Sequence, residues 1–510
     1  MKKMAQASEY KAVPTNANGD ESFVNDGNRA KASELSHGPT FGKRHQQLLM
    51  MFFEVVIYNS VKHSMAICLV AMTDPNANPN KKIPTYEWTN QNMIISMYIW
   101  GYTLPQIAAG WIVTTYGPKW FMVGAMTMSS LLGLMIPTTA SLTGDVGVIV
   151  CRFLQGCFHA VMPTATYTLL GKWLPVSERS RMSSHVFTGS SIGAVISMLL
   201  SGYIAGSWYG WPMVFYVYNG SGLVWAFIFC FIGSNCPGDH PTISIQEKTF
   251  IETYSFSTDK KNLSTPWIKI LTSSCFWALV LAELSFIWGY YTLLSQTPAY
   301  FNYTMKINIK SNGVLSSLPL LAKWLSTYIF IYVADILISK KICSIGKTRK
   351  IMTVLSSMIP CVALIVLGNS KAGEGEKCVA LLIVALGFAS ANYSGALVNC
   401  LDLSPNYSGV LTGINYQISM MLAALSPLSV DFFVVDKEDP EQWKYVFYLT
   451  AVIYTFSTVI YLIFGSGKVQ TWNDEIQKRK NSVCTVQEDE VLNTMSNKQL
   501  VSKQDGKEMA

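Results

Sequence analysis

Residues 235–266 read NCPGDHPTISIQEKTFIETYSFSTDKKNLSTP and form a long polar stretch in the middle of an otherwise apolar chain. Of the 510 residues, 50% are hydrophobic and only 14% are charged. A soluble domain has about 25% charged residues, so this chain has too few charges to cover the surface of a soluble protein of its length. The composition therefore predicts an all-α polytopic membrane protein, with residues 235–266 outside the bilayer.

Six apolar runs precede the polar stretch and six follow it, and each is long enough to cross a bilayer, which takes about 20 apolar residues per helix. These runs predict two six-helix halves, residues 44–234 and 267–466, joined by a linker at 235–266 and flanked by tails at 1–43 and 467–510. The predicted spans are residues 46–72, 90–114, 119–140, 146–171, 182–206 and 212–234, then 267–299, 312–338, 348–368, 377–400, 405–433 and 443–465.

Lysine and arginine in the short loops predict the side on which each loop lies, because positively charged loops stay in the cytosol. The loops after the second, fourth and eighth spans are rich in these residues and are predicted to be cytosolic, as are both tails and the linker. The loop after the seventh span is then external, and its sequon Asn302-Tyr303-Thr304 predicts glycosylation at Asn302. The basic residues of the cytosolic loops are Lys119, then Lys172, Arg179 and Arg181, then Lys340, Lys341, Lys347, Arg349 and Lys350.

Basic residues inside the first and fourth spans are the main functional signal, because a charge at that depth costs about 2.5–3.5 kcal/mol and usually faces a cavity or a partner. Lys62 is in the middle of the first span, and His63 beside it is predicted to point elsewhere on the helix and to be structural. Arg152 lies near the external end of the fourth span; it could extend to the interface, but we favour a cavity. His159 follows two helical turns later on a similar face, either as a titratable lining residue or as a hydrogen-bonded helix contact. Two basic side chains from different helices indicate an anionic substrate, which would offset the cost of burying them.

Acidic residues inside the spans give a second set of candidates. Glu283 in the seventh span and Lys323 in the eighth carry opposite charges near the centres of consecutive helices, which predicts an ion pair. The alternative is that Glu283 binds the coupling ion, a proton or sodium. Glu54 lies near the cytosolic end of the first span and is interpreted as a gate or a surface contact. Asp335, near the end of the eighth span, is also assigned to gating.

Enzyme chemistry is not indicated, because the chain lacks the GxSxG, HExxH and GxxxxGK[ST] motifs of hydrolases, metalloproteases and ATP-driven pumps. The eleven cysteines are scattered without a CxxC or a Cys/His ligand spacing, so no metal site is predicted. The chain has no run of basic residues interleaved with aromatic residues, the pattern that would indicate nucleic-acid binding. We predict no cofactor other than a coupling ion, sodium or a proton.

Several long stretches occur together in one order: RFLQGCFHAVMPTATYTLLGKWLPVSERSR (152–181), GWPMVFYVYNGSGLVW (210–225), NGVLSSLPLLAKW (312–324), LDLSPNYSGVLTGI (401–414), EQWKYVFYLTAVI (441–453) and YLIFGSGKVQTW (461–472). In these stretches the chain resembles the anion:cation symporter family of the major facilitator superfamily, which includes sialin, the vesicular glutamate transporters and the type I sodium–phosphate cotransporters. The likeness covers roughly residues 41–472 and is closest to invertebrate members named as inorganic phosphate cotransporters. It implies the major facilitator fold of twelve helices, alternating access, and an anion-binding role for Arg152. Lys62 lies where relatives carry an arginine in the first span.

The chain also departs from that family at positions tied to function. Relatives such as sialin carry a glutamate linked to proton coupling where this chain has His159. The vesicular glutamate transporters carry an arginine and a histidine where this chain has Phe286 and Ile95, so the resemblance does not imply glutamate specificity.

The loop signature after the second span, GWIVTTYGPKW (110–120), is only partly kept. Gly110, Gly117 and Lys119 are present and are assigned to gating. Thr114 and Thr115 replace the acidic–basic pair that helps to latch the outward-facing state in the superfamily. The resemblance therefore implies a latch that is weaker or differently built.

Together, the residues and the resemblance predict a secondary active transporter of small anions, inorganic phosphate or an organic anion, coupled to sodium or protons. Lys62, Arg152 and His159 are assigned to substrate binding, and His159, Glu283 and Lys323 to ion coupling or charge pairing. The alternative is a non-transporting membrane sensor or scaffold on the same fold. We expect a monomer in the lipid bilayer with a small anion as its partner and no nucleic acid. Neither tail has an acidic dileucine motif, which favours the plasma membrane over a lysosomal or vesicular membrane.

Overall fold

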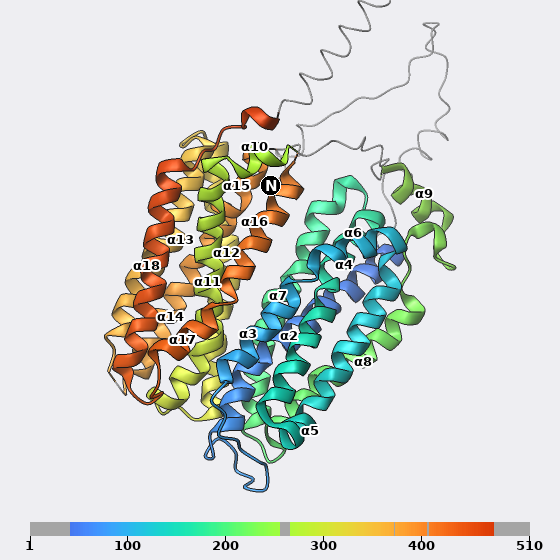
Figure 1. The fold of residues 1–510 in the computed structure, drawn as a ribbon. Helices are drawn as coiled ribbons and strands as arrows, with labels where there is room; N and C mark the ends of the chain where they lie inside the picture. The colour runs from blue at the N-terminus through green and yellow to red at the C-terminus, as the bar shows by residue number, and fades with distance from the viewer. Residues whose placement is uncertain (1–40, 255–265, 372, 405–406, 474–510) are drawn as a thin grey trace, which may run out of the picture.

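The computed structural model describes residues 41–254, 266–371, 373–404 and 407–473, and the regular structure of these residues is entirely helical. Two helical bundles lie side by side (Figure 1). We call the end that carries α9 and α10 the cytosolic end, following the charge bias of the loops, and the opposite end the external end.

The N-terminal half contains α2 (Lys43–Thr73), α3 (Gln91–Thr103), α4 (Gln106–Tyr116), α5 (Pro118–His159), α6 (Val161–Trp173), α7 (Val176–Ala205) and α8 (Gly210–Ile232). The connection holds η1 (Pro237–Asp239), α9 (Ile245–Tyr254) and α10 (Trp267–Leu271). The C-terminal half contains α11 (Ser274–Ala299), η2 (Tyr300–Thr304), α12 (Ile309–Ser339), α13 (Ile345–Gly368), α14 (Gly375–Ala389), η3 (Ser390–Ser394), α15 (Ala396–Leu403), α16 (Ser408–Ala423), α17 (Ser426–Phe433) and α18 (Pro440–Phe464), followed by η4 (Thr471–Asn473).

Nine helices in the described part of the chain are long and apolar enough to cross a membrane. One of them, Pro118–Trp173, has 56 residues. At 1.5 Å per residue it would be about 84 Å long, more than twice the thickness of a hydrocarbon core. It breaks at Gly144, whose φ of 66° and ψ of −147° are not helical, and so it supplies both the third and the fourth predicted span.

The second and eleventh predicted spans are each divided into two shorter helices. Pro105 separates α3 from α4, as expected for a residue without a backbone N–H. α16 and α17 are separated at Ala424 and Leu425, just before Pro427. Each piece is too short to cross a membrane alone, so the nine long helices are consistent with twelve spans in two halves.

Two glycines bring α3 and α5 into close contact inside the N-terminal half. A Cβ atom on Gly101 would lie 2.1 Å from the carbonyl oxygen of Phe153, and one on Gly156 would lie 2.3 Å from that of Tyr98. Only residues without a side chain permit such an approach of two backbones. The contact fixes Tyr98 of α3 against the turn of α5 that carries Arg152.

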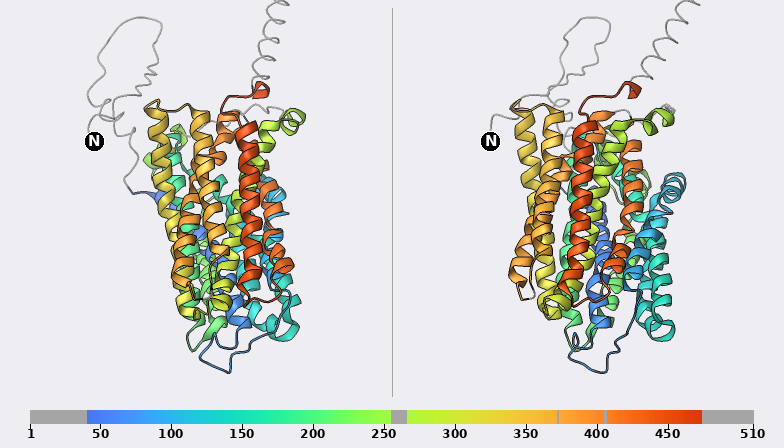
Figure 2. Two further views of the ribbon diagram at one scale, coloured as in Figure 1. Left: turned by 90° about the vertical axis from the view of Figure 1, so that its left-hand side faces the viewer. Right: turned by 60° about the vertical axis from the view of Figure 1, so that its left-hand side comes forward.

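The two halves meet mainly through α7 and α12. A Cβ atom on Gly202 would lie 2.6 Å from the Cα atom of Gly313, so the backbones of these helices touch near the external end. Figure 1 shows the bundles spreading apart toward the cytosolic end. Figure 2 shows the long connection between α2 and α3 projecting at the external end.

The polar linker is partly folded onto the N-terminal half. The Glu247 carboxylate of α9 accepts hydrogen bonds from the backbone N–H groups of Lys43 (3.0 Å) and Arg44 (2.9 Å) at the start of α2. The Arg44 guanidinium carbon also lies 5.0 Å from the centroid of the Phe250 ring. The helix α9 is therefore fixed to α2, whereas residues 255–265 of the predicted linker lie outside the described residues.

Candidate functional site

Arg152 is buried inside the N-terminal half, with 2% of its surface exposed. Its Nη1 donates to Gln155 Oε1 (2.7 Å) and its Nη2 to the carbonyl oxygen of Lys62 (3.2 Å). The guanidinium carbon lies 4.4 Å from the centroid of the Tyr98 ring. No carboxylate of the described residues pairs with it, and its burial rules out the alternative in which it extends to the interface.

Lys62 lies between rings from both halves of the molecule. Its ammonium nitrogen is 5.1 Å from the centroid of Tyr102 in α3 and 5.0 Å from that of Tyr291 in α11. Lys62, Arg152 and Tyr98 border a narrow cavity of about 30 Å³ between the halves. His63 borders the same cavity, so the prediction that it points elsewhere is wrong: neighbouring positions on α2 both reach a space that lies between two bundles.

His159 is placed behind this cavity, not on its wall. A hydrogen bond of 2.6 Å joins the Tyr98 hydroxyl to His159 Nδ1, and the Tyr58 ring of α2 lies 5.9 Å from the imidazole. Tyr98 therefore stands between the imidazole and the Arg152 guanidinium. Of the two sequence interpretations, the structure favours the hydrogen-bonded helix contact.

Glu283 and Lys323 do not form the ion pair predicted from the sequence. Among the described residues, Glu283 Oε2 accepts from the Asn392 amide (2.9 Å), and no carboxylate oxygen lies within 4.0 Å of the Lys323 ammonium. The Lys323 nitrogen lies 3.7 Å from the centroid of Tyr290 and 5.6 Å from that of Tyr393. Aromatic faces therefore hold this cation in place of a carboxylate, an arrangement that could not be predicted from the spacing of residues along either helix.

Glu54 is completely buried, with 0% of its surface exposed. Its Oε2 accepts a hydrogen bond from Thr166 Oγ1 of α6 (2.9 Å). The surface-contact interpretation is therefore wrong. Asp335, in contrast, is exposed, and its carboxylate makes no hydrogen bond or ion pair in the described part of the chain, so its gating role stays a prediction.

The loop between α4 and α5 is tied to the N-terminal half. Gly117 has a φ of 93°, a conformation that favours glycine, and the Lys119 backbone N–H donates to Asn235 Oδ1 (2.9 Å). The Lys119 ammonium lies 4.9 Å from the Trp120 ring centroid. Gly110 lies in α4, where a Cβ would make only an ordinary contact with Thr164 at 3.8 Å. The gating roles of these residues stay predictions.

Polar side chains close the external end across the two halves, and the sequence analysis missed them. Asn92 of α3 donates to Asp431 Oδ1 (2.5 Å), and its own side-chain oxygen accepts from the Gln296 amide (2.8 Å). Asn302 donates through its side-chain nitrogen to Asp74 Oδ2 (2.8 Å). A glycan on that nitrogen would require this contact to open. Glycosylation at Asn302 stays a prediction.

Weakening these contacts is expected to expose the cavity to the outside. Asn92→Leu removes bonds to Asp431 and Gln296, and a hydrogen bond to a charged group contributes about 1.5–3 kcal/mol. A cysteine introduced at Ser295, which borders the cavity, should then react about tenfold faster with a membrane-impermeant thiol reagent. Asn90→Leu is the matched control, because Asn90 bonds to Asp145 within one half. Equal rates in both variants would mean that Asn92 does not keep this end closed.

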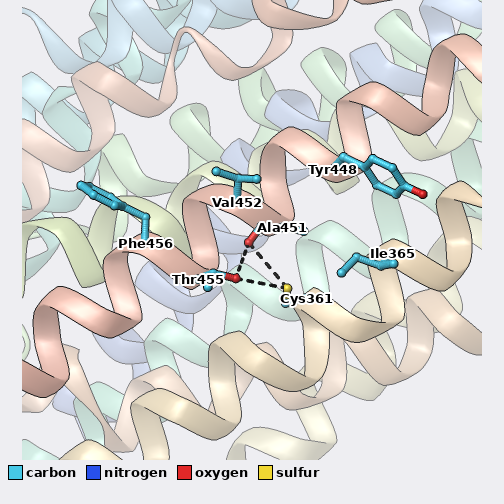
Figure 3. A pocket seen from close by; sticks show the side chains of 7 residues that line it. All are labelled: Cys361, Ile365, Tyr448, Ala451, Val452, Thr455 and Phe456. Atoms are coloured by element: carbon cyan, nitrogen blue, oxygen red, sulfur yellow. Dashed lines mark hydrogen bonds between the residues drawn. The ribbon is translucent and has the colours of Figure 1, made fainter.

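A larger apolar groove of about 510 Å³ lies on the outer side of the C-terminal half, between α13 and α18. Figure 3 shows its lining, in which Cys361, Ala451 and Thr455 bond to one another, whereas the Tyr448 hydroxyl bonds to Asn369 outside the lining. Thr455 Oγ1 donates to the Ala451 carbonyl oxygen (2.9 Å), and Cys361 Sγ lies 3.4 Å from Thr455 Oγ1. With no cation in its lining, this groove is unsuited to an anion, so the cavity beside Arg152 is the candidate site.

Comparisons with known proteins agree with this architecture. Residues 84–427 match the model of the Major Facilitator Superfamily. The chain is 32% identical over 472 residues to a Drosophila melanogaster protein named "Putative inorganic phosphate cotransporter", covering 87% of this chain and 89% of that protein. It is 32% identical over 418 residues to human vesicular glutamate transporter 2, covering 81% of this chain and 71% of that one.

A solved structure has the same fold: a bacterial homologue of the human lysosomal transporter Spinster, in an inward-facing and occupied conformation. The two chains superpose with a TM-score of 0.65 at 12% identity, covering 83% of this chain and 97% of the other. The family match covers most of the chain and agrees with its two bundles of membrane-spanning helices. The protein is thus a multi-pass integral membrane protein that belongs to the Major Facilitator Superfamily.

Proposed function

We propose that the protein is a secondary active transporter that carries a small anion, inorganic phosphate or an organic acid, across the membrane. The observation that carries the proposal is a set of three cations, Lys62, Arg152 and Lys323, inside the membrane with no carboxylate partner among the described residues. Burying unpaired charges is costly, and an anion bound among them would offset that cost. The names of the two relatives, which refer to phosphate and glutamate, support the same class of substrate.

The three cations belong to different halves of the molecule, and this arrangement fits transport by alternating access. Lys62 and Arg152 come from the N-terminal half and Lys323 from the C-terminal half, and Lys62 lies within electrostatic range of both other cations. An anion between them attracts both halves, so its binding favours states in which the cations lie close together. A ligand shifts a conformational equilibrium only through such a difference in affinity.

The aromatic rings around Lys62 and Lys323 offset part of the free-energy cost of burying these cations when no anion is bound. A cation over a ring gains about 0.5–2 kcal/mol, far less than an ion pair with a carboxylate would gain at this depth. An arriving anion can therefore draw Lys62 and Lys323 off their rings at a small cost. We further propose that a driving ion, sodium or a proton, powers accumulation of the anion; the coupling roles that the sequence assigns to His159 and Glu283 stay predictions.

Uptake measurements test the proposal. Cells that express the protein are expected to take up radiolabelled phosphate or one member of a panel of organic acids faster than control cells. The panel is measured with and without sodium, and at pH 5.5 and 7.4. Surface-expressed protein that moves none of these anions would overturn the proposal and favour a sensor or scaffold.

Lys62→Met is expected to raise the KM for the transported anion at least tenfold. At about 4 Å, two charges in a partly hydrated protein interact by up to about 4 kcal/mol, so tenfold, or about 1.4 kcal/mol, is a conservative expectation. Lys310→Met is the matched control, because the Lys310 ammonium also lies over a ring, that of Tyr203 at 5.9 Å, but outside the cavity lining. An unchanged KM in Lys62→Met would remove Lys62 from the site.

A further inference from the structure

Glu54 is a carboxyl group inside the membrane part of the molecule with very few polar neighbours among the described residues. Its Oε1 is buried and has no hydrogen-bond partner, whereas its Oε2 has one, the Thr166 hydroxyl. No lysine, arginine or histidine of the described residues lies within ion-pair distance. A carboxylate is expensive to bury without a cation or several donors, so in this conformation the group is expected to hold a proton.

Among the residues that the structure describes, the elements packed around Glu54 bring no basic side chain within ion-pair distance of it. α7 meets this part of α2 through Gly189 and Gly193, and α8 meets it through Trp225, whose ring nitrogen donates to the Met50 carbonyl oxygen. From α6 the contact is Thr166. The titratable groups nearby are phenols: Tyr58, one turn further along α2, lies within electrostatic range of Glu54 and of Tyr416 from the C-terminal half.

A line of contacts leads from Tyr58, one helical turn from Glu54 on α2, to the anion site. Tyr58 packs beside His159 with ring centroids 5.9 Å apart, His159 bonds to the Tyr98 hydroxyl at 2.6 Å, and the Tyr98 ring carries the Arg152 guanidinium at 4.4 Å. Thr166 follows His159 by seven residues, two helical turns, and so lies on a similar face.

The surroundings fit a proton better than a sodium ion. A hard metal cation takes several oxygen ligands, whereas Glu54 has a single hydroxyl beside it. Among the described residues no cluster of three or more His, Cys, Asp or Glu side chains could hold a metal ion. A proton needs only one carboxylate oxygen, and Oε1 is available for it.

We propose that Glu54 is the proton-binding site that couples transport to a proton gradient. The carboxylate takes a proton from water on one side of the membrane and releases it to water on the other, one proton per cycle, while the anion travels between Lys62, Arg152 and Lys323. This inference rests on the proposed transport function and deepens it by naming the coupling ion and its site.

The test uses the full-length protein in liposomes, with the anion identified by the uptake panel. Two quantities are measured for each variant: accumulation driven by an inward pH gradient, and exchange of labelled for unlabelled anion without a gradient. Glu54→Gln is expected to lose gradient-driven accumulation at least tenfold while exchange changes less than about twofold. Glu54→Asp should retain accumulation with a shifted pH midpoint, and Glu376→Gln, an exposed carboxyl on α14, should match the wild type.

The outcomes separate the two claims. Wild-type protein with neither accumulation nor exchange would overturn the transport function and this inference with it. Exchange in the wild type together with sodium-driven, pH-independent accumulation would overturn the role of Glu54 alone. So would full proton-driven accumulation in Glu54→Gln, or its loss in Glu283→Gln but not in Glu54→Gln. Should Glu54→Gln fail to reach the membrane, an unshifted pH midpoint in Glu54→Asp would overturn the role instead.

Discussion

Arg152→Ala is expected to reduce anion uptake at least a hundredfold, about 2.7 kcal/mol, while leaving the amount of protein at the surface within about twofold of the wild type. The guanidinium is the most deeply buried of the three site cations, and it faces the cavity without a carboxylate partner. Removing it deletes a charge-assisted contact to the anion, and contacts of this kind are worth 2–5 kcal/mol when desolvated. Uptake kinetics and surface biotinylation together check this prediction.

Arg152→Lys is the informative companion variant. Lysine keeps the charge but has no planar fork, so it cannot donate to Gln155 and to the Lys62 carbonyl oxygen in the same way. We expect uptake between that of the wild type and that of the alanine variant. Uptake retained in Arg152→Ala would remove this residue from the binding site.

Gly156→Leu is expected to abolish folded protein in the membrane. A Cβ atom at this position would lie 2.3 Å from the Tyr98 carbonyl oxygen and 2.8 Å from the Tyr102 backbone nitrogen. These atoms belong to helix backbone and cannot move aside as a flexible side chain could, so the cost exceeds the usual 1–3 kcal/mol of overpacking. Surface abundance and thermal stability in detergent measure the effect.

Gly124→Leu is the matched control for that prediction, because a Cβ at Gly124 has nothing within 4 Å. It lies in the same helix, α5, and should keep near-normal abundance and uptake. Comparable losses in both variants would show that leucine is harmful anywhere in α5. The contact between α3 and α5 would then not be the cause.

The site charges could be predicted from the sequence because a charge inside a membrane span is rare and costly. That reasoning found Lys62, Arg152, Glu283 and Lys323, and it fixed the two-halved architecture from the lengths of the apolar runs. It could not find the aromatic partners of the lysines. Tyrosines in a membrane protein are expected at the interfaces, and spacing along one helix does not reveal which rings of other helices meet a cation.

Two other errors have the same physical origin. The predicted ion pair between Glu283 and Lys323 assumed that opposite charges on consecutive helices face each other, but side-chain direction depends on how the helices are rotated. The external contacts around Asn92 were missed because the search for functional residues looked for charges, and an uncharged amide does not show from the sequence which residues of the other half it meets. Both features depend on packing between helices that are far apart in the chain.

The attachment of α9 to α2 has a consequence for how the two halves move relative to each other. Since Glu247 and Phe250 hold α9 against the start of α2, α9 is expected to move with the N-terminal half as one rigid unit when the bundles rotate. Breaking these contacts would separate α9 from that half without changing a residue inside the membrane.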